Sequence, residues 1–389
     1  MTGEPNIFLH QHLRLVCISE DHSVIAGGVP AVVDQLSYRV AGCGIPVNQI
    51  HVRSGGMPSR KGVEADCVVP SRLGASWGWS PQLRENIIRM STFSESVLFH
   101  LHGIWAAPQY VGATVAKERS IPFIVSAHGM LEPWLWERQG KMVRTKKEIY
   151  WKLFAYPALR LASVVHAITP LEQQHLHALF PSNRIEVIPN AIDLDEYPDA
   201  GSGQQERERL ILFVGRIEPK KGVDILLRAF AASHVSSDWR VAIIGPVWSF
   251  EYQAELAKIV DENVLGDRVS FLGPVFGEEK RRWMRKAWLL AAPSHSEVVG
   301  LVNLEAAVYC VPSITTHQTG LDDWANGGGM LIQPDVEQMR AALEQACAWS
   351  DSERAERGRA SRRLVSERYS WDAVLPQWIS LYESLVVKG

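Results

Sequence analysis

Short runs of apolar residues recur along the chain, each ending at glycine, proline, serine or asparagine, and longer amphipathic stretches separate them. This alternation is typical of βα units, in which a buried strand leads into an amphipathic helix. It predicts two sets of parallel strands. In the first half the strands are expected at residues 13–18, 97–101, 122–125, 164–168 and 185–188. In the second half they are expected at residues 210–214, 240–244, 269–272, 288–292 and 311–315.

A small, polar and charged segment, residues 200–209, separates the two sets and has the composition of an exposed linker. The chain has 389 residues, which suits two domains. We therefore predict an α/β protein of two doubly wound, Rossmann-like domains, residues 1–200 and 201–371. Beyond residue 371, Val374, Trp378, Leu381 and Leu385 follow near-helical spacing and predict a last helix with an apolar face.

Two cations occupy the turn that follows the expected strand 210–214. This turn, residues 215–222, contains Arg216 and Lys221 and leads into a helix near Val223. Ligands of α/β folds bind at the carboxyl edge of the sheet, where such turns lie. A guanidinium fork and an ammonium together suit a diphosphate. Taken alone, the turn is equally well explained as a solvated basic loop.

A second strand-to-helix turn carries two carboxylates. Glu297 lies in the loop after the strand 288–292, Gly300 allows close backbone approach, and a helix is expected to begin near Leu301. The first amides of that helix, those of Leu301 and Val302, would be unpaired donors for an anion. Glu297 and Glu305, the latter expected two turns into the helix, could accept hydrogen bonds from sugar or ribose hydroxyls on either side of it.

These motifs resemble those of the retaining glycosyltransferases of family 4, which have the GT-B fold. The resemblance rests on Gly215-Arg216…Lys221-Gly222, on Glu297-x7-Glu305 and on the preceding segment Val187–Asp193. Further landmarks follow in family order from about residue 13 to the C-terminus. They are Gly27-Gly28 after the first strand, the segment 126–134 around His128, and residues 367–371 before the last helix.

The resemblance implies a role for each matched residue. Arg216 and Lys221 would contact the donor diphosphate, Glu305 the nucleotide ribose and Glu297 the hydroxyls of the transferred sugar. His128 would lie at the sugar from the opposite domain, and Gly27-Gly28 would approach the phosphates or the acceptor. Residues 201–371 would then bind the nucleotide sugar and residues 1–200 the acceptor, with residues 372–389 crossing back to the first domain and the active site lying in the cleft.

Four positions depart from the commonest family pattern: Val298, Val299, Ala191 and Lys220. The valine pair replaces the usual Gly-Phe and obscures which sugar is held. The donor base is equally open, so a GDP-linked or a UDP-linked sugar is admissible.

Charge and composition narrow the partners and the cofactors. The formal net charge is −3, which gives no polycationic signature for nucleic acid. No metal is expected: Asp193-Leu194-Asp195 lies in a loop where Asp usually caps backbone groups, and the pairs His100/His102 and His175/His177 have no carboxylate or cysteine at ligand spacing. Structural or solvent-facing histidines are the better interpretation.

Two features that the sequence lacks bear on where the protein is located. No segment approaches the ~20 consecutive apolar residues that cross a bilayer, and the first residues lack a charged and apolar leader, so a cytoplasmic protein is expected. The five cysteines form no CxxC pair and are expected to be buried, reduced thiols.

Residues 134–152 are basic and aromatic, with Trp134, Trp136, Tyr150 and Trp151 among six cations. The sequence supports two interpretations of this segment equally. The segment could lie on an anionic membrane surface beside a lipid-linked acceptor, or it could be a solvated helix with its aromatic rings turned inward.

The resulting hypothesis is a retaining, metal-independent glycosyltransferase that moves a hexose, mannose or similar, from a nucleotide-diphosphate sugar to a glycan or lipid-linked acceptor. Resemblance around residues 126–134 favours bacterial lipopolysaccharide, O-antigen or exopolysaccharide synthesis. The alternatives are an epimerase or phosphorylase of similar fold, or a non-catalytic nucleotide-sugar-binding relative.

Overall fold

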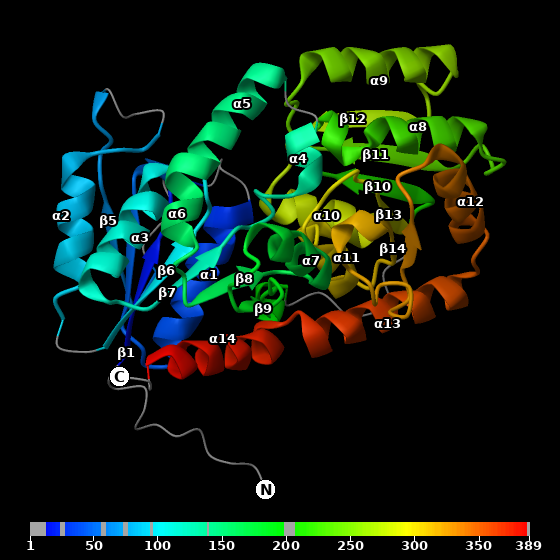
Figure 1. Ribbon diagram of the computed structural model, residues 1–389. Helices are drawn as coiled ribbons and strands as arrows, with labels where there is room; N and C mark the ends of the chain where they lie inside the picture. Colours follow the sequence, from blue (N-terminus) through cyan, green and yellow to red (C-terminus); the bar gives the residue numbers. More distant parts are fainter. Residues whose placement is uncertain are drawn as a thin grey trace, which may run out of the picture. The chain divides into compact units, whose positions relative to one another are not determined.

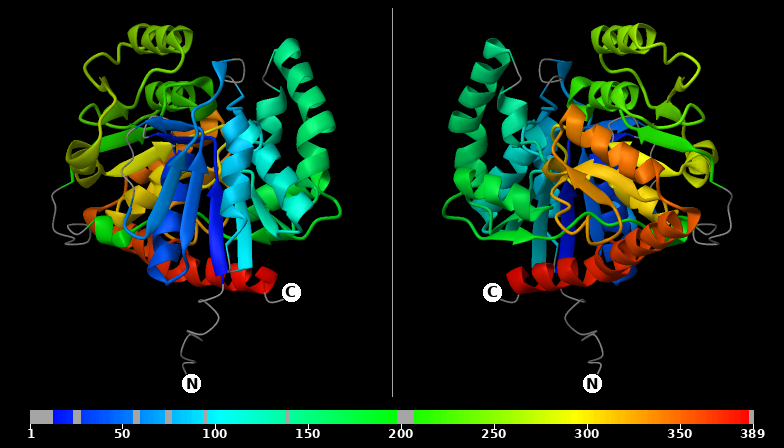
Figure 2. Two further views of the ribbon diagram at one scale, coloured as in Figure 1. Left: turned by 90° about the vertical axis from the view of Figure 1, so that its left-hand side faces the viewer. Right: turned by 90° about the vertical axis from the view of Figure 1, so that its right-hand side faces the viewer.

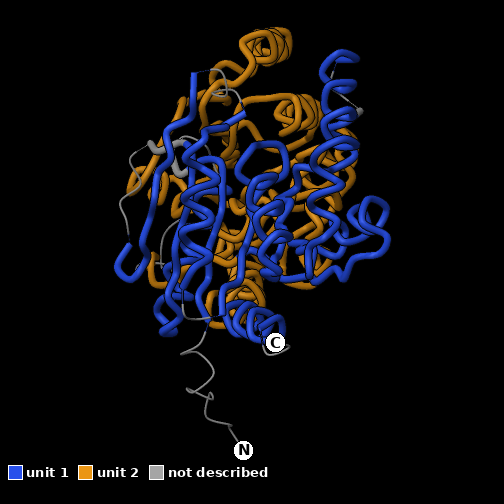
Figure 3. Tube along the Cα trace, turned by 60° about the vertical axis from the view of Figure 1, so that its left-hand side comes forward, with its two compact units in different colours: residues 1–190, 374–389 blue, residues 191–373 orange. Residues whose placement is uncertain are grey.

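The computed structural model describes residues 13–23, 28–55, 60–72, 77–93, 96–137, 140–197 and 207–386 (Figure 1). The chain divides into two compact units, residues 1–190 with 374–389 and residues 191–373 (Figure 3). Each unit is built on its own parallel sheet. The two are described separately below.

Unit 1 contains a seven-stranded parallel sheet in the order β5-β3-β1-β6-β7-β8-β9. Its strands are β1 (Leu13–Ile18), β3 (Val47–His51), β5 (Val63–Cys67), β6 (Ser96–His102), β7 (Phe123–Ser126), β8 (Val164–Ala167) and β9 (Ile185–Val187). A separate two-stranded sheet pairs β2 (Asp21–Ser23) with β4 (Arg53–Gly55).

Helices connect most of these strands, as is usual for parallel pairing, and a further helix ends the chain's described part. They are α1 (Gly28–Gly42), α2 (Pro81–Met90), α3 (Ala107–Arg119), α4 (Pro133–Glu137), α5 (Lys141–Tyr150), the π-helical turn η4 (Trp151–Ala155), α6 (Tyr156–Leu159), α7 (Pro170–Leu179) and the C-terminal α14 (Trp371–Val386). The first residues of α14 belong to unit 2, and from Val374 onward the helix belongs to unit 1. Figure 2 shows α14 in red alongside the strands of unit 1.

Unit 2 repeats the same winding with six parallel strands in the order β12-β11-β10-β13-β14-β15. The strands are β10 (Leu210–Val214), β11 (Arg240–Ile244), β12 (Val269–Gly273), β13 (Leu289–Ala292), β14 (Ser313–Thr316) and β15 (Met330–Ile332). The α-helices are α8 (Val223–Ala232), α9 (Phe250–Glu262), α10 (Gly277–Lys286), α11 (Leu301–Val308), α12 (Val336–Cys347) and α13 (Asp351–Arg368). Short 3-10 turns are η5 (Leu194–Glu196), η6 (Pro219–Lys221) and η7 (His317–Thr319).

Each unit has its own apolar core. All ten predicted strands form, and their ends differ from the predicted ones by at most two residues. Three strands of the main sheets, β3, β5 and β15, were not predicted. β3 is fully buried yet contains Asn48, which accepts a hydrogen bond from Arg14 (2.9 Å) and donates one to Glu64 (2.9 Å). Because these partners satisfy its amide, a polar residue occupies a buried strand and hides it from an apolar pattern.

Two smaller expectations can also be compared with the structure. Cys43 and Cys67 are exposed, so the expectation of buried thiols is wrong for these two, because both lie at element ends. Asp193 caps η5, and its Oδ1 accepts a hydrogen bond from the Asp195 amide (3.1 Å), which confirms the capping role.

Candidate functional site

In unit 2 the strand order changes direction between β10 and β13, because the chain adds strands on one side of β10 and then on the other. The loops that leave these neighbouring strands therefore meet at the carboxyl edge of the sheet. The His295 amide, after β13, donates to the Lys220 carbonyl, after β10 (2.9 Å). Gly222 has φ +66°, and a Cβ there would overlap the Pro293 carbonyl oxygen. Glycine thus permits the close contact of the two predicted loops.

Lys221 and Glu297 form an ion pair across these loops, with side chains only 18% and 20% exposed. Burial raises the pKa of the Glu297 carboxyl, but Lys221, Lys220 and Arg216 together lower it further, so its net pKa lies below the usual value. Glu297 is therefore ionised within a cluster of three cations. Lys221 is not the solvated basic side chain of the alternative interpretation.

Arg216 lies at the outer side of this cluster. Its guanidinium pairs with Glu218 (2.9 Å) and lies 5.0 Å from the ring centroid of Trp248, which is 61% exposed. The loops after β10 and β11 are joined by a hydrogen bond from the Ile217 amide to the Pro246 carbonyl (2.9 Å). Trp248 was not predicted as a site residue, because it follows a different strand and no motif marks it.

The helix α11 begins directly after Glu297 and presents free amides. Gly300 is its N-cap, with φ +57° and no side-chain capping hydrogen bond. Leu301 and Val302 open the helix as predicted, and no acidic residue lies in its first turn. The first amides and the positive end of the helix dipole are thus available to an anion beside Lys221.

Glu305 is the fifth residue of α11, so it lies little more than one turn from the helix start; the expected two turns were wrong. The helix starts at Leu301 as expected, but each turn takes 3.6 residues, so four residues advance the chain by little more than one turn. Its Oε2 pairs with Lys280 of α10 (2.6 Å). Burial raises the pKa of the Tyr197 hydroxyl, and the nearby negative charge of Glu305 raises it further. Neither Lys280 nor Tyr197 was predicted.

In unit 1, His128 follows β7 with a left-handed backbone, φ +52°. Its Nε2 lies 3.1 Å from His102 Nδ1, and the two rings stack with centroids 5.3 Å apart. Burial lowers the pKa of His128 to about 3, so the ring is neutral. Of the predicted glycine turn, Gly28 is exposed at the start of α1, whereas Gly27 lies outside the described residues.

Behind His128 lies a buried chain of hydrogen bonds that the sequence did not predict. His166 Nε2 donates to the Ile188 carbonyl (2.7 Å), which leaves Nδ1 to accept from the Ser126 hydroxyl (2.8 Å). Ser126 in turn accepts from His100 Nε2 (2.7 Å), and His100 Nδ1 accepts from the Tyr382 hydroxyl of α14 (3.0 Å). The carbonyl thereby fixes every tautomer in the chain. His100 and His102 are accordingly buried structural histidines.

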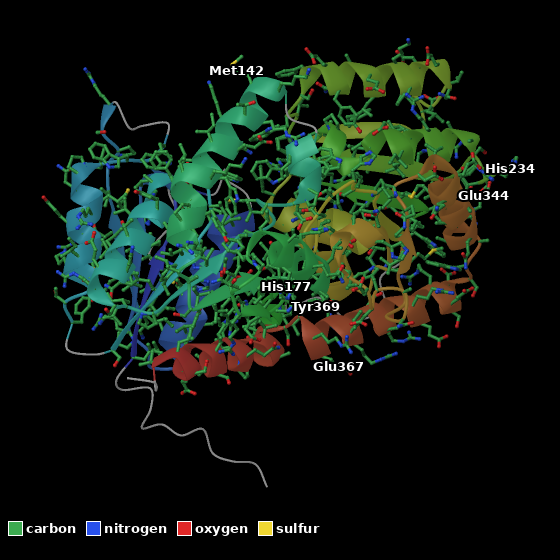
Figure 4. All side chains as sticks on the ribbon, in the orientation of Figure 1. Met142, His177, His234, Glu344, Glu367 and Tyr369 are labelled. Atoms are coloured by element: carbon green, nitrogen blue, oxygen red, sulfur yellow. The ribbon has the colours of Figure 1, made fainter. Side chains whose placement is uncertain are left out.

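Segment 134–152 has two different faces. Trp136, Tyr150 and Trp151 pack against the core of unit 1, as the inward interpretation expected. The same segment leaves Met142, Val143 and Ile149 exposed to solvent, and α5 has no buried residue. Figure 4 shows Met142 at the outer end of α5. The two interpretations are therefore not exclusive.

The described part of the chain holds neither a metal-binding cluster nor a membrane-spanning helix. No group of three or more His, Cys, Asp or Glu side chains there is arranged to hold a metal ion. Within the same ranges, no helix combines the length and the apolarity needed to span a bilayer.

Two family models match the chain consecutively. "Glycosyltransferase Family 4" matches residues 26–196, and "Glycosyl transferases group 1" matches residues 199–363. Two similar proteins are D-inositol 3-phosphate glycosyltransferases. That of Mycobacterium sp. (strain KMS) is 33% identical over 212 residues, 47% of this chain and 48% of its own. That of Kineococcus radiotolerans is 28% identical over 325 residues, which cover 74% of this chain and 72% of its own. The chain spans about half the length of the Mycobacterium relatives that it matches.

Solved structures with the same fold cover nearly the whole chain. Sucrose-phosphate synthase from Thermosynechococcus elongatus superposes with a TM-score of 0.76 at 19% identity, over 97% of this chain and all of that one. HepE of Anabaena, solved with UDP and glucose, superposes with a TM-score of 0.73 at 18% identity, over 96% of this chain and all of that one. WaaG, a glycosyltransferase of lipopolysaccharide biosynthesis, superposes with a TM-score of 0.68 at 16% identity, over 97% of this chain and all of that one. The predicted fold of two Rossmann-like domains is confirmed.

Proposed function

Because the chain belongs to glycosyltransferase family 4, we propose that it is a retaining enzyme that transfers a hexose from a nucleotide-diphosphate sugar to a glycan or lipid-linked acceptor. One observation carries the donor half of this proposal. Lys221, Lys220 and Arg216 surround the ionised Glu297 directly beside the uncapped start of α11. A diphosphate is the anion that such a set of cations and amides suits.

The proposed reaction uses the donor's own phosphate. The bond between the sugar C1 and the diphosphate oxygen breaks, and the acceptor oxygen bonds to C1 on the same face. The acceptor proton passes to the departing diphosphate oxygen. Arg216, Lys221 and the amides of Leu301 and Val302 stabilise the negative charge that develops there. This assignment requires no metal ion and no cofactor.

The carboxylates and His128 complete the proposed site. Glu297 accepts hydrogen bonds from the transferred sugar's hydroxyls, and Glu305 from the ribose. His128, neutral at physiological pH, contacts the sugar, and Gly300 lets the backbone approach the donor. Gly27 and Gly28 are proposed to contribute backbone amides toward the phosphates or the acceptor. Residues 201–371 would thus bind the donor and residues 1–200, with 372–389, the acceptor.

The acceptor is proposed to be membrane-associated, as in bacterial surface-polysaccharide synthesis. The exposed apolar residues of α5 beside Lys141 and Lys146 support a peripheral contact of segment 134–152 with an anionic membrane. The proposal includes GDP-mannose and UDP-linked hexoses as donors. Since the curated relatives are named for D-inositol 3-phosphate, that phosphorylated polyol belongs in any acceptor panel.

The first test is thermal stabilisation by GDP, UDP, ADP and their sugar conjugates, each with and without EDTA, because a ligand of the folded state raises its apparent stability. We expect a shift with one base that EDTA leaves unchanged and that Lys221→Gln largely removes. Lys258→Gln, an exposed lysine of α9 in the same unit, is the matched control. No shift with any nucleotide, or an equal shift in both variants, would refute the donor site.

Turnover separates the proposal from its alternatives. Transfer to an acceptor extract with loss of the donor supports the glycosyltransferase. Free sugar phosphate or an epimerised donor would indicate the phosphorylase or the epimerase. Nucleotide-sugar binding with no reaction across the acceptor panel would indicate the non-catalytic relative.

A further inference from the structure

An apolar cavity of about 600 Å³ opens in unit 1, entirely outside the residues proposed to bind the donor. Its walls come from the loop after β7, from α4, from α5 with η4, and from α7. Its volume lies in the range of small-molecule sites. Its lining includes Trp136, Arg144, Trp151, Lys152, Ala178 and Leu179.

The walls are hydrophobic and the charges of the lining are mainly basic. Trp136, Trp151 and Leu179 supply aromatic and aliphatic surface. Arg144 and Lys152 contribute two cations, of which Arg144 pairs with Glu148 of its own helix (2.8 Å). Lys152 is exposed and forms no ion pair with any side chain in the described ranges. The cavity therefore suits a ligand with an apolar body and an anionic group.

The outer surface of the same helical segment is apolar. Met142, Ile149 and Leu153 are 71%, 51% and 65% exposed, and their spacing of seven and four residues places them on one stripe. Lys146 lies beside this stripe. Such a surface suits the interface of an anionic bilayer. The cavity and the stripe share the segment α5–η4 but lie on different faces of it, because Arg144 and Glu148 line the cavity and Met142 and Ile149 belong to the stripe.

The π-helical turn η4 connects the two features. A π-turn inserts an extra residue into a helix, is rare, and frequently lies at functional sites. Here it spans Trp151–Ala155, so that Trp151 and Lys152 line the cavity while Leu153 and Phe154 remain exposed.

We propose that this cavity binds the hydrocarbon chain of an anionic lipid acceptor, with Lys152 and Arg144 at its phosphate. The inference rests on the proposed function and names the class of its acceptor. The cavity wall leads to His128: the Gly129 amide donates to Glu172 of α7 (2.7 Å), and Glu132 pairs with His175 of α7 (2.8 Å). These contacts fix the loop 128–133 between the cavity and His128.

Calorimetric titration of the full chain with dodecyl phosphate, below its micelle concentration, tests the proposal. Methyl phosphate supplies the anion alone, and dodecyl maltoside supplies the chain alone. We expect saturable 1:1 binding of dodecyl phosphate, weaker binding of dodecyl maltoside and none of methyl phosphate. Equal binding of methyl phosphate would overturn the proposal, as would no binding of dodecyl phosphate.

Two pairs of variants locate the site. Ala178→Trp fills the cavity from an exposed position of α7 and should weaken dodecyl phosphate binding at least about tenfold. His177→Trp adds the same ring to the same helix outside the lining, and Figure 4 shows that residue on α7. Lys152→Gln should weaken dodecyl phosphate but not dodecyl maltoside, whereas Lys141→Gln, outside the lining, should affect neither. Indistinguishable effects within either pair would place the lipid elsewhere.

The outcome is separable from that of the proposed function. Nucleotide binding reports on unit 2, and dodecyl phosphate binding reports on the cavity of unit 1. Nucleotide binding with no lipid binding would refute the cavity alone and favour a water-soluble glycan acceptor. Lipid binding with no nucleotide binding would refute the glycosyltransferase assignment and leave a lipid site without a donor.

Discussion

At the scale of single residues, the pair Lys221–Glu297 shows how a cluster of cations is compensated. Lys221, Lys220 and Arg216 repel each other, and Glu297 provides the opposite charge, which is why its pKa is lowered despite burial. Under the proposed function, a donor diphosphate would take over this compensation, and the carboxylate would then accept a hydrogen bond from a sugar hydroxyl.

Gly222 is the residue on which this arrangement most depends. Gly222→Ala would have to keep φ +66° and would place a methyl group against the Pro293 carbonyl. We expect the free energy of unfolding of unit 2 to fall by about 1–3 kcal/mol. Nucleotide binding should also weaken, because the loops after β10 and β13 would separate. Urea denaturation and nucleotide titration measure the two effects.

Gly266→Ala is the control, since a Cβ at Gly266 meets nothing within 4 Å and its φ is not in the left-handed range. If both alanine variants behaved alike, the close contact of the two loops would not be what requires glycine.

At the scale of elements, the hydrogen-bond chain from Tyr382 to Ile188 attaches α14 to β6, β7 and β8. Each member donates in one direction, so loss of the first donor leaves the next acceptor buried and unpaired. Trp378 packs on the same histidines, with its ring 5.0 Å from that of His100 and 4.5 Å from that of His166. One hydroxyl and one indole of α14 therefore contact the buried histidines of the sheet.

Tyr382→Phe keeps the ring and removes the donor to His100 Nδ1. We expect a loss of about 1–3 kcal/mol in the free energy of unfolding, and faster amide exchange in α14 than in the rest of unit 1. Tyr38→Phe is the control, because that side chain is more than a third exposed and its hydroxyl can bond to water. Equal stability of the two variants would mean that the chain does not hold α14.

How much the sequence predicts depends on where the partners of a residue lie. Strands such as β10 are continuous apolar runs and were predicted, and so was the loop with Arg216 and Lys221 that follows it. The partners of those residues were not. Trp248, Lys280 and Tyr197 come from elements that only the strand order brings together, and no spacing along the chain relates them to Glu305 or Arg216.

Polar residues in the core set a second limit. His100 and His102 lie at the end of the strand predicted at residues 97–101, and the sequence identified no partner for either. The partners Ser126, His166 and Tyr382 come from two other strands and from the far end of the chain. In the same way, Asn48 conceals β3 because Arg14 and Glu64 satisfy it.

At the scale of the whole molecule, the two units differ in the groups that burial perturbs. Unit 1 holds neutral histidines: burial lowers the pKa of His166 to about 4 and of His128 to about 3. Unit 2 holds Glu297, whose pKa is lowered from 4.5. Acid should therefore weaken unit 1 at a higher pH than unit 2.

The sign follows from proton binding. Between about pH 6.5 and pH 4, unfolded His166 and His128 bind protons that the folded side chains do not, so the free energy of unfolding falls as pH falls. Glu172 acts in the opposite sense, because burial raises its pKa to about 7 and the folded state then binds the extra proton between pH 7 and 4.5. His100 and His102 are buried in the same unit and their pKa is lowered as well, so the histidines outnumber this one carboxyl and the net effect is a loss of stability as pH falls.

Hydrogen exchange by mass spectrometry, corrected for the intrinsic rate at each pH, follows the two units in one sample. Protection of peptides from β6, β7 and β8 should fall between pH 6.5 and 4.5. Protection of peptides from β10 and β13 should hold until pH drops below about 4.5, where Glu297 of the unfolded state takes up a proton that the folded carboxylate, paired with Lys221, does not. Simultaneous loss of protection in both units would mean that they unfold as one, and constant protection in β6–β8 would mean that the buried histidines do not control acid stability.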